Sequence, residues 1–401
     1  MKGGFHFYRG SGLGAARYFD EGHKGAEAYY TEDARVAVQI DTWQGGRRVG
    51  TATLAEAGDL VQWVEGVDPL TGEVKGIIRT GGPERQPLRF VETVVNNPKS
   101  LSIVASQNPT VAEVLDRTLA RQADEVARYL SVVAVTRIGP KGAQRDVGGL
   151  RVETARVTHL TSREGDPHRH VHLMLNTRVM APDGTWRGLH SAALRQHIGA
   201  VQRVGERVLM TDPDLRRTLA QHGYTLGPDG EIDQARDAVA LLSKRSAQVA
   251  ERRAALEAAW RAEHPDREPS QRVRNGWDRA AWEKTRKAKS AERETPEQLS
   301  ARIRAELAGA GYDFTPGARE QVVVAEVAVA DVDRDLVATE ALAVLSGKRS
   351  AWSRAELTAE VEAAVVRTGV TGPGEAVGEL VEDCHARALD RNDPTGRRLV
   401  G

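Results

Sequence analysis

The stretch HLTSREGDPHRHVHL, residues 159–173, contains four of the chain's eleven histidines. His168, His170 and His172 alternate, and alternate side chains of a β-strand point to the same face. His159 ends the earlier strand-like stretch ARVTHL, and the residues between are sufficient for a hairpin that returns antiparallel. Three neutral imidazoles are good ligands for a borderline divalent metal and leave positions open for a substrate. The spacing therefore predicts a catalytic metal site made of His159, His170 and His172.

His168 directly follows Asp166 and Pro167, so we expect it to belong to the turn and to stay out of the metal site. The alternative for all four histidines is a surface position on an exposed hairpin. Two alternating histidines with a third at hairpin distance favour the metal site over that alternative.

Three of the chain's seven tyrosines, Tyr18, Tyr29 and Tyr30, fall within LGAARYFDEGHKGAEAYYTED. Half-exposed tyrosines among Ala, Gly and charged residues are poor core material. A phenol can act as a nucleophile, and its phosphate ester retains the energy of the phosphodiester, so that a bond between tyrosine and DNA can be reversed. A metal that polarises the phosphate would complete this chemistry. Taken alone, the tyrosines are better explained as helix-packing aromatics.

The elements that position these residues change in character along the chain. The first 200 residues mix strand-like stretches, such as GFHFYR, RVAVQIDTW and LRFVETVV, with a long amphipathic pattern over residues 111–132. After about Gln202 the sequence becomes rich in Ala, Arg and Glu with helical periodicity. We expect an α+β fold in the first part and mostly helices in the second.

Composition excludes several classes of protein. The single cysteine, Cys384, excludes an intramolecular disulfide, and no run of eighteen apolar residues occurs, so we expect a soluble cytoplasmic protein. The formal charge is zero, with 56 basic and 56 acidic residues. Residues 271–289 nevertheless carry seven Lys or Arg against two acids, and a basic stretch of this kind is typical of contact with nucleic acid.

Several motifs in the expected order resemble the relaxase region of MobF-type (TrwC/TraI-like) conjugative relaxases, members of the HUH endonuclease class. They are ARYFDEGHKGAEAYY, GVDPLTGE, FVETVVNNPKSLSIVA, HLTSREGDPHRHVHLMLN and DGTWRGLH, followed by the helical LLSKRSAQVAERRAAL and WEKTRKAKS. The resemblance covers roughly residues 1–315. It implies an α+β fold with an antiparallel five-stranded HUH (ferredoxin- or palm-like) sheet, flanking helices and a mostly helical fingers region.

The resemblance also implies roles for individual residues. Tyr18 would cut the DNA strand and stay linked to its 5′ phosphate, and Tyr29 or Tyr30 would serve a second strand transfer. Glu92 stands where the family has an aspartate that orients a metal histidine and takes the tyrosine proton. Phe19 replaces what is often a second tyrosine of the first pair, which leaves Tyr18 as the candidate there.

A single strand that passes the metal needs a cationic groove with aromatic platforms, worth roughly 1–3 kcal/mol per stacked base. The predicted DNA contacts are Lys99, Arg163, Arg272, Arg274, Trp277, Trp282, Lys284 and Arg286. A solvated charged helix is the alternative for residues 271–289, and for any individual residue of the stretch it is the favoured interpretation. We divide the chain into a catalytic core (1–205), a fingers region that clamps DNA (206–315) and a helical segment resembling the start of a helicase region (316–401).

The sequence thus predicts a divalent metal cofactor, Mg²⁺ or Mn²⁺, with Zn²⁺ or Ni²⁺ in purified protein. As partners, the family resemblance implies single-stranded DNA, an adjacent DNA hairpin at a transfer origin, and accessory DNA-binding and type IV coupling or secretion proteins. LSGKRS lacks features of a nucleotide-binding P-loop, so we expect no ATPase activity. The alternatives are a rolling-circle replication initiator of the same chemistry, in which the tyrosine follows the histidines, and a non-catalytic DNA-binding protein stabilised by a metal. A three-histidine enzyme acting on small molecules would leave the tyrosines and the basic helix unexplained.

Overall fold

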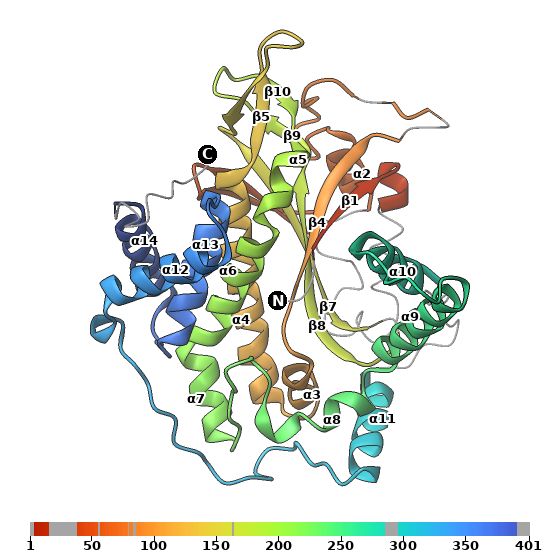
Figure 1. Ribbon diagram of the computed structural model, residues 1–401, viewed down its shortest axis with the longest axis vertical. Helices are drawn as coiled ribbons and strands as arrows, with labels where there is room; N and C mark the ends of the chain where they lie inside the picture. The colour runs from red at the N-terminus through yellow and green to blue at the C-terminus, as the bar shows by residue number, and fades with distance from the viewer. Residues whose placement is uncertain are drawn as a thin grey trace.

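Figure 1 shows the chain as a computed structural model. The structure describes residues 4–15, 38–54, 57–78, 80–82, 86–162, 164–284 and 296–390. For residues 57, 279, 282–284 and 296 it describes the backbone alone. Within these ranges no helix is both long and apolar enough to cross a membrane.

The centre of the fold is a sheet of six strands. In spatial order they are β1 (Phe5–Arg9), β4 (Leu88–Asn96), β8 (Pro167–Asn176), β7 (Val152–Thr161), β2 (Val38–Gln44) and β3 (Arg47–Leu54). Every neighbouring pair is antiparallel. Two short hairpins accompany the sheet, β5 (Val135–Ile138) with β6 (Arg145–Gly148), and β9 (Arg178–Met180) with β10 (Trp186–Gly188).

The predicted antiparallel sheet is confirmed, but it has six strands where five were expected. Strand β3 has no counterpart among the strand-like stretches in the sequence, because it lies at the sheet edge and most of its side chains are exposed. Such an edge strand lacks the alternation of apolar and polar residues that a half-buried strand needs. A two-residue turn at Gly45 and Gly46, with φ of 56° and 79°, joins it to β2, and positive φ at both positions favours glycine.

The helices surround this sheet. They are α2 (Ala57–Glu65), α3 (Lys99–Gln107), α4 (Pro109–Val133), α5 (Ser191–Leu194), α6 (Ile198–Thr211), α7 (Pro213–Gln221), α8 (Ala238–Leu241), α9 (Lys244–Glu263), α10 (Gln271–Lys284), α11 (Pro296–Gly309), α12 (Arg334–Lys348), α13 (Arg354–Arg367) and α14 (Gly374–Asp390). Short 3₁₀ turns occur at Arg195–His197, Asp233–Ala235 and Val329–Asp331. The predicted helical character after Gln202 is confirmed.

Helix α4 covers one face of the sheet and accounts for the amphipathic pattern of residues 111–132. The helix begins after Asn108, whose side chain accepts a hydrogen bond from the Val111 amide at 3.2 Å, with Pro109 in the first turn. Its buried stripe packs against alternate side chains of β4, β7 and β8. This core contains Leu119, Ala123, Val126 and Leu130 of the helix and Val91, Val95, Val152, Val171, Leu173 and Leu175 of the strands.

The opposite face of the sheet is covered only in part by α2, through Leu60, Trp63 and Val64. In Figure 1 the α9–α10 helix pair lies on this same side of the sheet, across from the ends of β7 and β8. A second core is formed by α3, α7, α8 and α11 with the first turns of α4 and the end of α6. The face that carries the predicted histidines therefore looks toward the α9–α10 pair.

Helices α12, α13 and α14 form a third core with each other, and α13 packs along α6. A buried ion pair joins the two, in which Arg207 Nε donates to Glu362 Oε2 at 2.6 Å. The division of the chain at residues 205 and 315 stays a prediction.

Candidate metal centre and nucleic-acid surfaces

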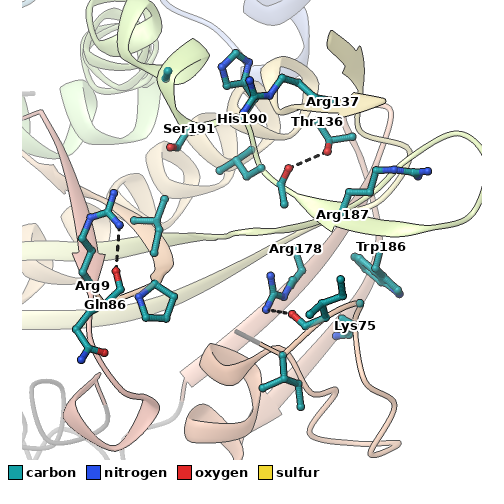
Figure 2. A pocket seen from close by; sticks show the side chains of 18 of the residues that line it. Arg9, Lys75, Gln86, Thr136, Arg137, Arg178, Trp186, Arg187, His190 and Ser191 are labelled. Carbon is teal, nitrogen blue, oxygen red and sulfur yellow. Dashed lines mark hydrogen bonds between the residues drawn. The ribbon is translucent and has the colours of Figure 1, made fainter. Parts of the chain in front are cut away.

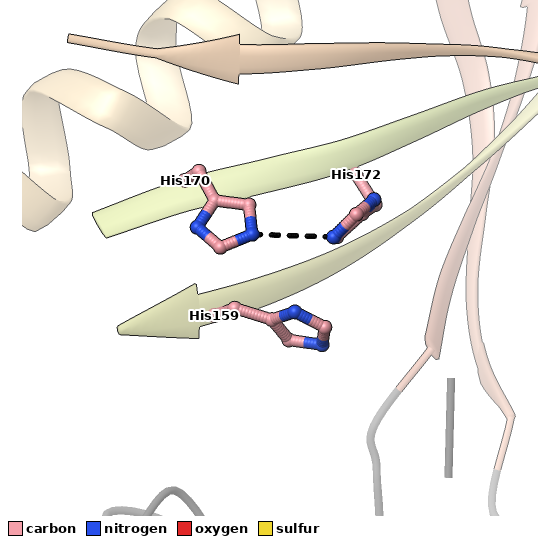
Figure 3. A group of neighbouring side chains, drawn as sticks. All are labelled: His159, His170 and His172. Carbon is pink, nitrogen blue, oxygen red and sulfur yellow. Dashed lines mark hydrogen bonds between the residues drawn. The ribbon is translucent and has the colours of Figure 1, made fainter. Parts of the chain in front are cut away.

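The β7–β8 hairpin brings the three predicted metal ligands together. His159 lies directly opposite His170 in the antiparallel register, and His172 follows two residues later on β8. All three are buried, at 7–8% exposure, and one nitrogen from each lies within 4.8 Å of the others. Figure 3 shows the three imidazoles turned toward one another. The predicted hairpin and the clustering of His159, His170 and His172 are confirmed in this geometry.

Fixed hydrogen-bond acceptors set the tautomers of two of these rings. His172 Nδ1 contacts Glu92 Oε1, and His170 Nδ1 lies 2.7 Å from the carbonyl oxygen of His168. A carboxylate and a carbonyl can only accept, so each Nδ1 carries a proton, and in a neutral ring this leaves the lone pair on Nε2. Burial, with His168 and His172 nearby, holds the pKa of His170 well below 6.5, which keeps that ring neutral.

The two Nε2 atoms of His170 and His172 lie 3.2 Å apart, as the dashed line in Figure 3 shows. A contact at this distance needs a cation between the two nitrogens, either a shared proton, as in the hydrogen bond drawn, or a metal ion. Nitrogens bound to one metal at roughly 2.0–2.1 Å are about 2.9–3.4 Å apart at octahedral or tetrahedral angles. The donor set therefore fits a divalent metal, and His159 supplies the third imidazole.

Glu92 lies beside this cluster and is 4% exposed. Its Oε1 contacts His172 Nδ1, and its Oε2 lies 3.3 Å from Nδ1 of His6 on the edge strand β1. Burial disfavours the charged form, but hydrogen bonds from His172 and His6 outweigh it and lower the pKa of Glu92 to about 2. Glu92 is therefore ionised at neutral pH and orients His172, as an acidic outer partner of a metal histidine does.

His6 was missed by the sequence analysis, which read GFHFYR only as a strand. The available signal was its place in that alternating stretch, because His6 is the direct register partner of Glu92 and therefore shares its face of the sheet. Which strand pairs with β4 cannot be read from spacing alone.

His168 lies in β8, so its expected place in the turn is wrong. The strand begins at Pro167, one residue earlier, where Thr161 pairs with Pro167. His168 stacks on His170 with ring centroids 4.7 Å apart, and burial, followed by the charge of Lys99, lowers its pKa to about 4. It does not join the metal cluster of the described residues.

The turn of the hairpin is tied to the helical region. Asp166, 1% exposed, accepts a hydrogen bond at Oδ2 from the backbone amide of Lys244, the first residue of α9, at 3.0 Å. Arg302 of α11 donates to the carbonyl oxygen of Gly165 at 3.0 Å. Lys99 begins α3, and burial lowers its pKa to about 8 while the Asp166 charge acts in the opposite direction. These contacts set the α9 helix against the histidine hairpin.

Several predicted site residues lie outside the described part of the chain: Tyr18, Tyr29, Tyr30, Arg163 and Arg286, with the side chains of Trp282 and Lys284. Nothing in the geometry bears on their roles, which stay predictions.

The predicted DNA-contact residues of helix α10 differ in their exposure to solvent. Arg272 is exposed. Arg274 is half-buried and pairs with Glu268 at 3.5 Å. Trp277 is 8% exposed and packs edge to face on Trp260 of α9, with centroids 5.9 Å apart. In this structure the Trp277 ring therefore holds α9 and α10 together, and its role as a stacking platform for bases stays a prediction.

A second feature, which the sequence did not reveal, is a groove of about 930 Å³ between β10, the start of β4 and residues 75–80. Figure 2 shows its basic side chains, which come from β1, β5, β9 and β10 as well as from residue 75 and residue 190. The basic residues that line it are Arg9, Lys75, Arg137, Arg178, Arg187 and His190, and none of the described lining residues is acidic. We call it the basic groove. Long-range contacts build it, so no local sequence pattern predicts it.

Comparisons with known proteins agree with this architecture. The TrwC relaxase family model matches residues 13–310. A comparison with curated proteins finds no match.

Three similar solved structures are the conjugative relaxase TrwC in complex with oriT DNA in a metal-bound form (TM-score 0.57), the same complex in a metal-free form (0.56), and TrwC with a 27-mer DNA comprising the recognition hairpin and the cleavage site (0.54). Each is 21% identical to this chain and covers 78% of it, and this chain covers all of each of them. These likenesses show a shared fold. Because the family model spans most of the chain, the protein belongs to the TrwC relaxase family of MobF-type conjugative relaxases.

Proposed function

We propose that this protein nicks one strand of DNA at a plasmid transfer origin, forms a covalent 5′-phosphotyrosyl intermediate, and so starts conjugative transfer in the cytoplasm. The observation that carries the proposal is the buried cluster of His159, His170 and His172 with Glu92 behind it, in a chain of the TrwC relaxase family. The solved TrwC structures with oriT DNA support the choice of substrate.

The chemical step is a transesterification at phosphorus. The Tyr18 oxygen attacks the scissile phosphate, a new P–O bond to tyrosine forms, and the bond to the 3′ oxygen breaks. The phenol proton leaves to a base, and the departing 3′ oxygen takes up a proton to become a free hydroxyl. No cofactor is consumed, so the 3′ hydroxyl can later attack the phosphotyrosine and rejoin the strand.

The described residues prepare the site for this step. Glu92 holds His172 with Nδ1 protonated, and the His168 carbonyl does the same for His170, so both Nε2 lone pairs face the cluster. A divalent metal held by the three imidazoles would polarise the phosphate and neutralise charge that develops on its oxygens. Glu92 already carries two hydrogen bonds, and its low pKa makes it a poor proton acceptor for the tyrosine. We therefore assign it to orienting His172.

We assign Tyr29 or Tyr30 to a second strand transfer that ends the process. The cleaved strand would run between the histidine face and the α9–α10 pair, and we assign contacts with it to Lys99, Arg163, Arg272, Arg274, Lys284 and Arg286. The adjacent DNA hairpin would bind at the basic groove, which has no acidic residue among its described lining. Lys75, Arg187 and His190 are already paired with Glu153, Asp183 and Asp146, so we assign the phosphate contacts first to Arg9 and Arg137. Accessory DNA-binding proteins and a type IV coupling protein would receive the complex.

Two alternatives use the same residues. A rolling-circle replication initiator would share the chemistry, but in such proteins the tyrosine follows the histidines, and here Tyr18 precedes them. A non-catalytic DNA-binding protein would keep the metal for stability alone. The cluster of three buried imidazoles fits a bound metal in both the enzyme and the DNA-binding alternative. Only a reaction of DNA distinguishes the two, and the experiment below measures that reaction.

The test uses single-stranded oligonucleotides that span the candidate transfer origin, with Mn²⁺ or Mg²⁺, on a denaturing gel. We expect a protein–DNA adduct that disappears with chelator and in Tyr18→Phe, while oligonucleotide binding persists in Tyr18→Phe. Binding without an adduct under every metal condition would replace the enzyme by the DNA-binding alternative.

A further inference from the structure

His6 is a polar residue beside the metal cluster for which the proposed mechanism has no use. It belongs to β1 at the edge of the sheet, and its side chain is 64% exposed. Its Nδ1 lies 3.3 Å from Glu92 Oε2, while the other oxygen of the same carboxylate contacts His172. One buried carboxylate thus connects an exposed imidazole to an imidazole of the metal cluster.

The geometry of Glu92 explains why a second contact matters. A glutamate side chain has three rotatable bonds, and its terminal torsion is broad. One hydrogen bond at Oε1 leaves the carboxylate free to turn about that contact. A second polar partner at Oε2, the His6 ring at 3.3 Å, restrains both the plane of the carboxylate and its rotamer.

Pairing and packing of strand β1 fix the backbone position of His6. His6 is the direct cross-strand partner of Glu92, and two residues further Tyr8 stacks on Phe90 with centroids 4.6 Å apart and planes 4° from parallel. Phe90 is fully buried in the core that covers the histidine face of the sheet. The strand is therefore fixed by packing at Tyr8, and the exposed His6 ring contributes mainly through its polar contact.

From these contacts we infer that His6 is a positioning residue of the metal centre. By donating from Nδ1 to Glu92 Oε2, it holds Glu92 so that Oε1 meets His172 Nδ1 and His172 Nε2 faces His170. The inference rests on the proposed function in one respect, that the three histidines bind a metal. It adds a residue to the centre, and it requires that the affinity for the metal depend on a side chain that does not touch the metal.

The test compares four forms of the full chain: the wild type, His6→Ala, His6→Asn and His6→Gln. The asparagine amide nitrogen takes the place of Nδ1, whereas the glutamine amide nitrogen takes that of Nε2. Both variants keep a neutral donor, but only His6→Asn keeps it where Glu92 can accept. The readout is the affinity for Co²⁺, followed by its visible absorption, which reports the ligands without DNA or turnover.

Loss of an outer partner of a metal ligand typically weakens metal binding 10- to 100-fold, and His6 acts one contact further away, so we expect about 3- to 10-fold weaker Co²⁺ binding in His6→Ala and His6→Gln. We expect His6→Asn to bind within about twofold of the wild type. In a Glu92→Ala background, His6→Ala should cause no further loss, because the two residues act through one contact. His222→Ala, at the end of α7, is the matched control and should bind as the wild type does.

Equal affinity in the wild type and His6→Ala would overturn the inference and leave the proposed function intact. A loss that persists undiminished in the Glu92→Ala background would also overturn it, because His6 would then act by another route. Absence of Co²⁺ binding in the wild type would remove the metal from the proposed function and the inference with it.

Discussion

His159 and His170 face each other across the β7–β8 hairpin as direct register partners, with ring centroids 5.2 Å apart at right angles. Because side chains alternate along a strand, a slip of one residue would move one of these rings to the opposite face. The apolar residues that alternate with the β8 histidines prevent such a slip, since Val171 and Leu173 are buried against α4 on that opposite face. The core on one side of the sheet thus sets the geometry of the metal site on the other.

The first prediction concerns the metal ligands. Replacing His159, His170 or His172 with alanine removes one of three imidazoles, so we expect Co²⁺ affinity to fall by more than the roughly 100-fold that loss of an outer partner can cost. His168→Ala is the matched control from the same strand and should still bind the ion. If His168→Ala loses the metal and His159→Ala keeps it, the assignment of the ligands is wrong.

A second prediction concerns Asp166, which accepts from the first amide of α9. Asp166→Ala leaves that amide without its acceptor, and loss of a helix cap costs about 0.5–2 kcal/mol. Asp166→Asn keeps an oxygen acceptor and should lose less. Urea unfolding measures both, with the exposed Glu113→Ala as a control that should stay within about 0.5 kcal/mol. Equal losses in the two Asp166 variants would show that the charge, and not the cap, stabilises this turn.

A third prediction concerns the ion pair between α6 and α13. Arg207→Met leaves the Glu362 carboxylate buried and without its partner guanidinium, and breaking a buried pair on one side costs about 3–5 kcal/mol. The double variant with Glu362→Met replaces both charges with apolar side chains and should recover most of that loss. Thermal unfolding of the two variants and the wild type provides the comparison. A double variant no more stable than Arg207→Met would contradict the pairing seen here.

A fourth prediction concerns the basic groove. Arg137 is exposed and lines it, so Arg137→Ala should weaken hairpin binding and reduce the slope of log affinity against log salt by about 1. Arg217→Ala on α7, an exposed arginine outside the groove, should change neither quantity. Fluorescence anisotropy with a labelled hairpin at several salt concentrations measures both. An unchanged slope in Arg137→Ala would exclude this groove as the hairpin site.

The sequence predicted the parts of the fold that local periodicity encodes. The alternation in HVHLML placed His170 and His172 on one strand face, and the apolar stripe of residues 111–132 gave helix α4 almost to its ends. It could not predict which strands become neighbours, because that depends on contacts distant in the chain. For this reason His6 and the basic groove went unnoticed, and the edge strand β3 was not expected.

In the candidate site too, the sequence predicts contacts within one hairpin but not contacts between strands that are distant in the chain. The ligand histidines are close in sequence, and one hairpin assembles them, whereas the contact of Glu92 with both His172 and His6 needs three strands in the order β1-β4-β8. Trp277 shows the same limit for helices, because its partner Trp260 lies on another helix and no spacing within α10 predicts that contact; its role as a platform for bases stays a prediction.

The most direct test of the central claim is to identify the residue that carries the DNA. Trypsin would release Tyr18 in the peptide YFDEGHK and both Tyr29 and Tyr30 in GAEAYYTEDAR, so mass spectrometry of a digested adduct separates the candidates. After a single cleavage reaction with Mn²⁺, we predict that the 5′ nucleotide of the cleaved strand is attached to YFDEGHK. Attachment to GAEAYYTEDAR would contradict the assignment of Tyr18, and a cleaved strand with a free 5′ phosphate and no modified peptide would contradict the covalent mechanism itself.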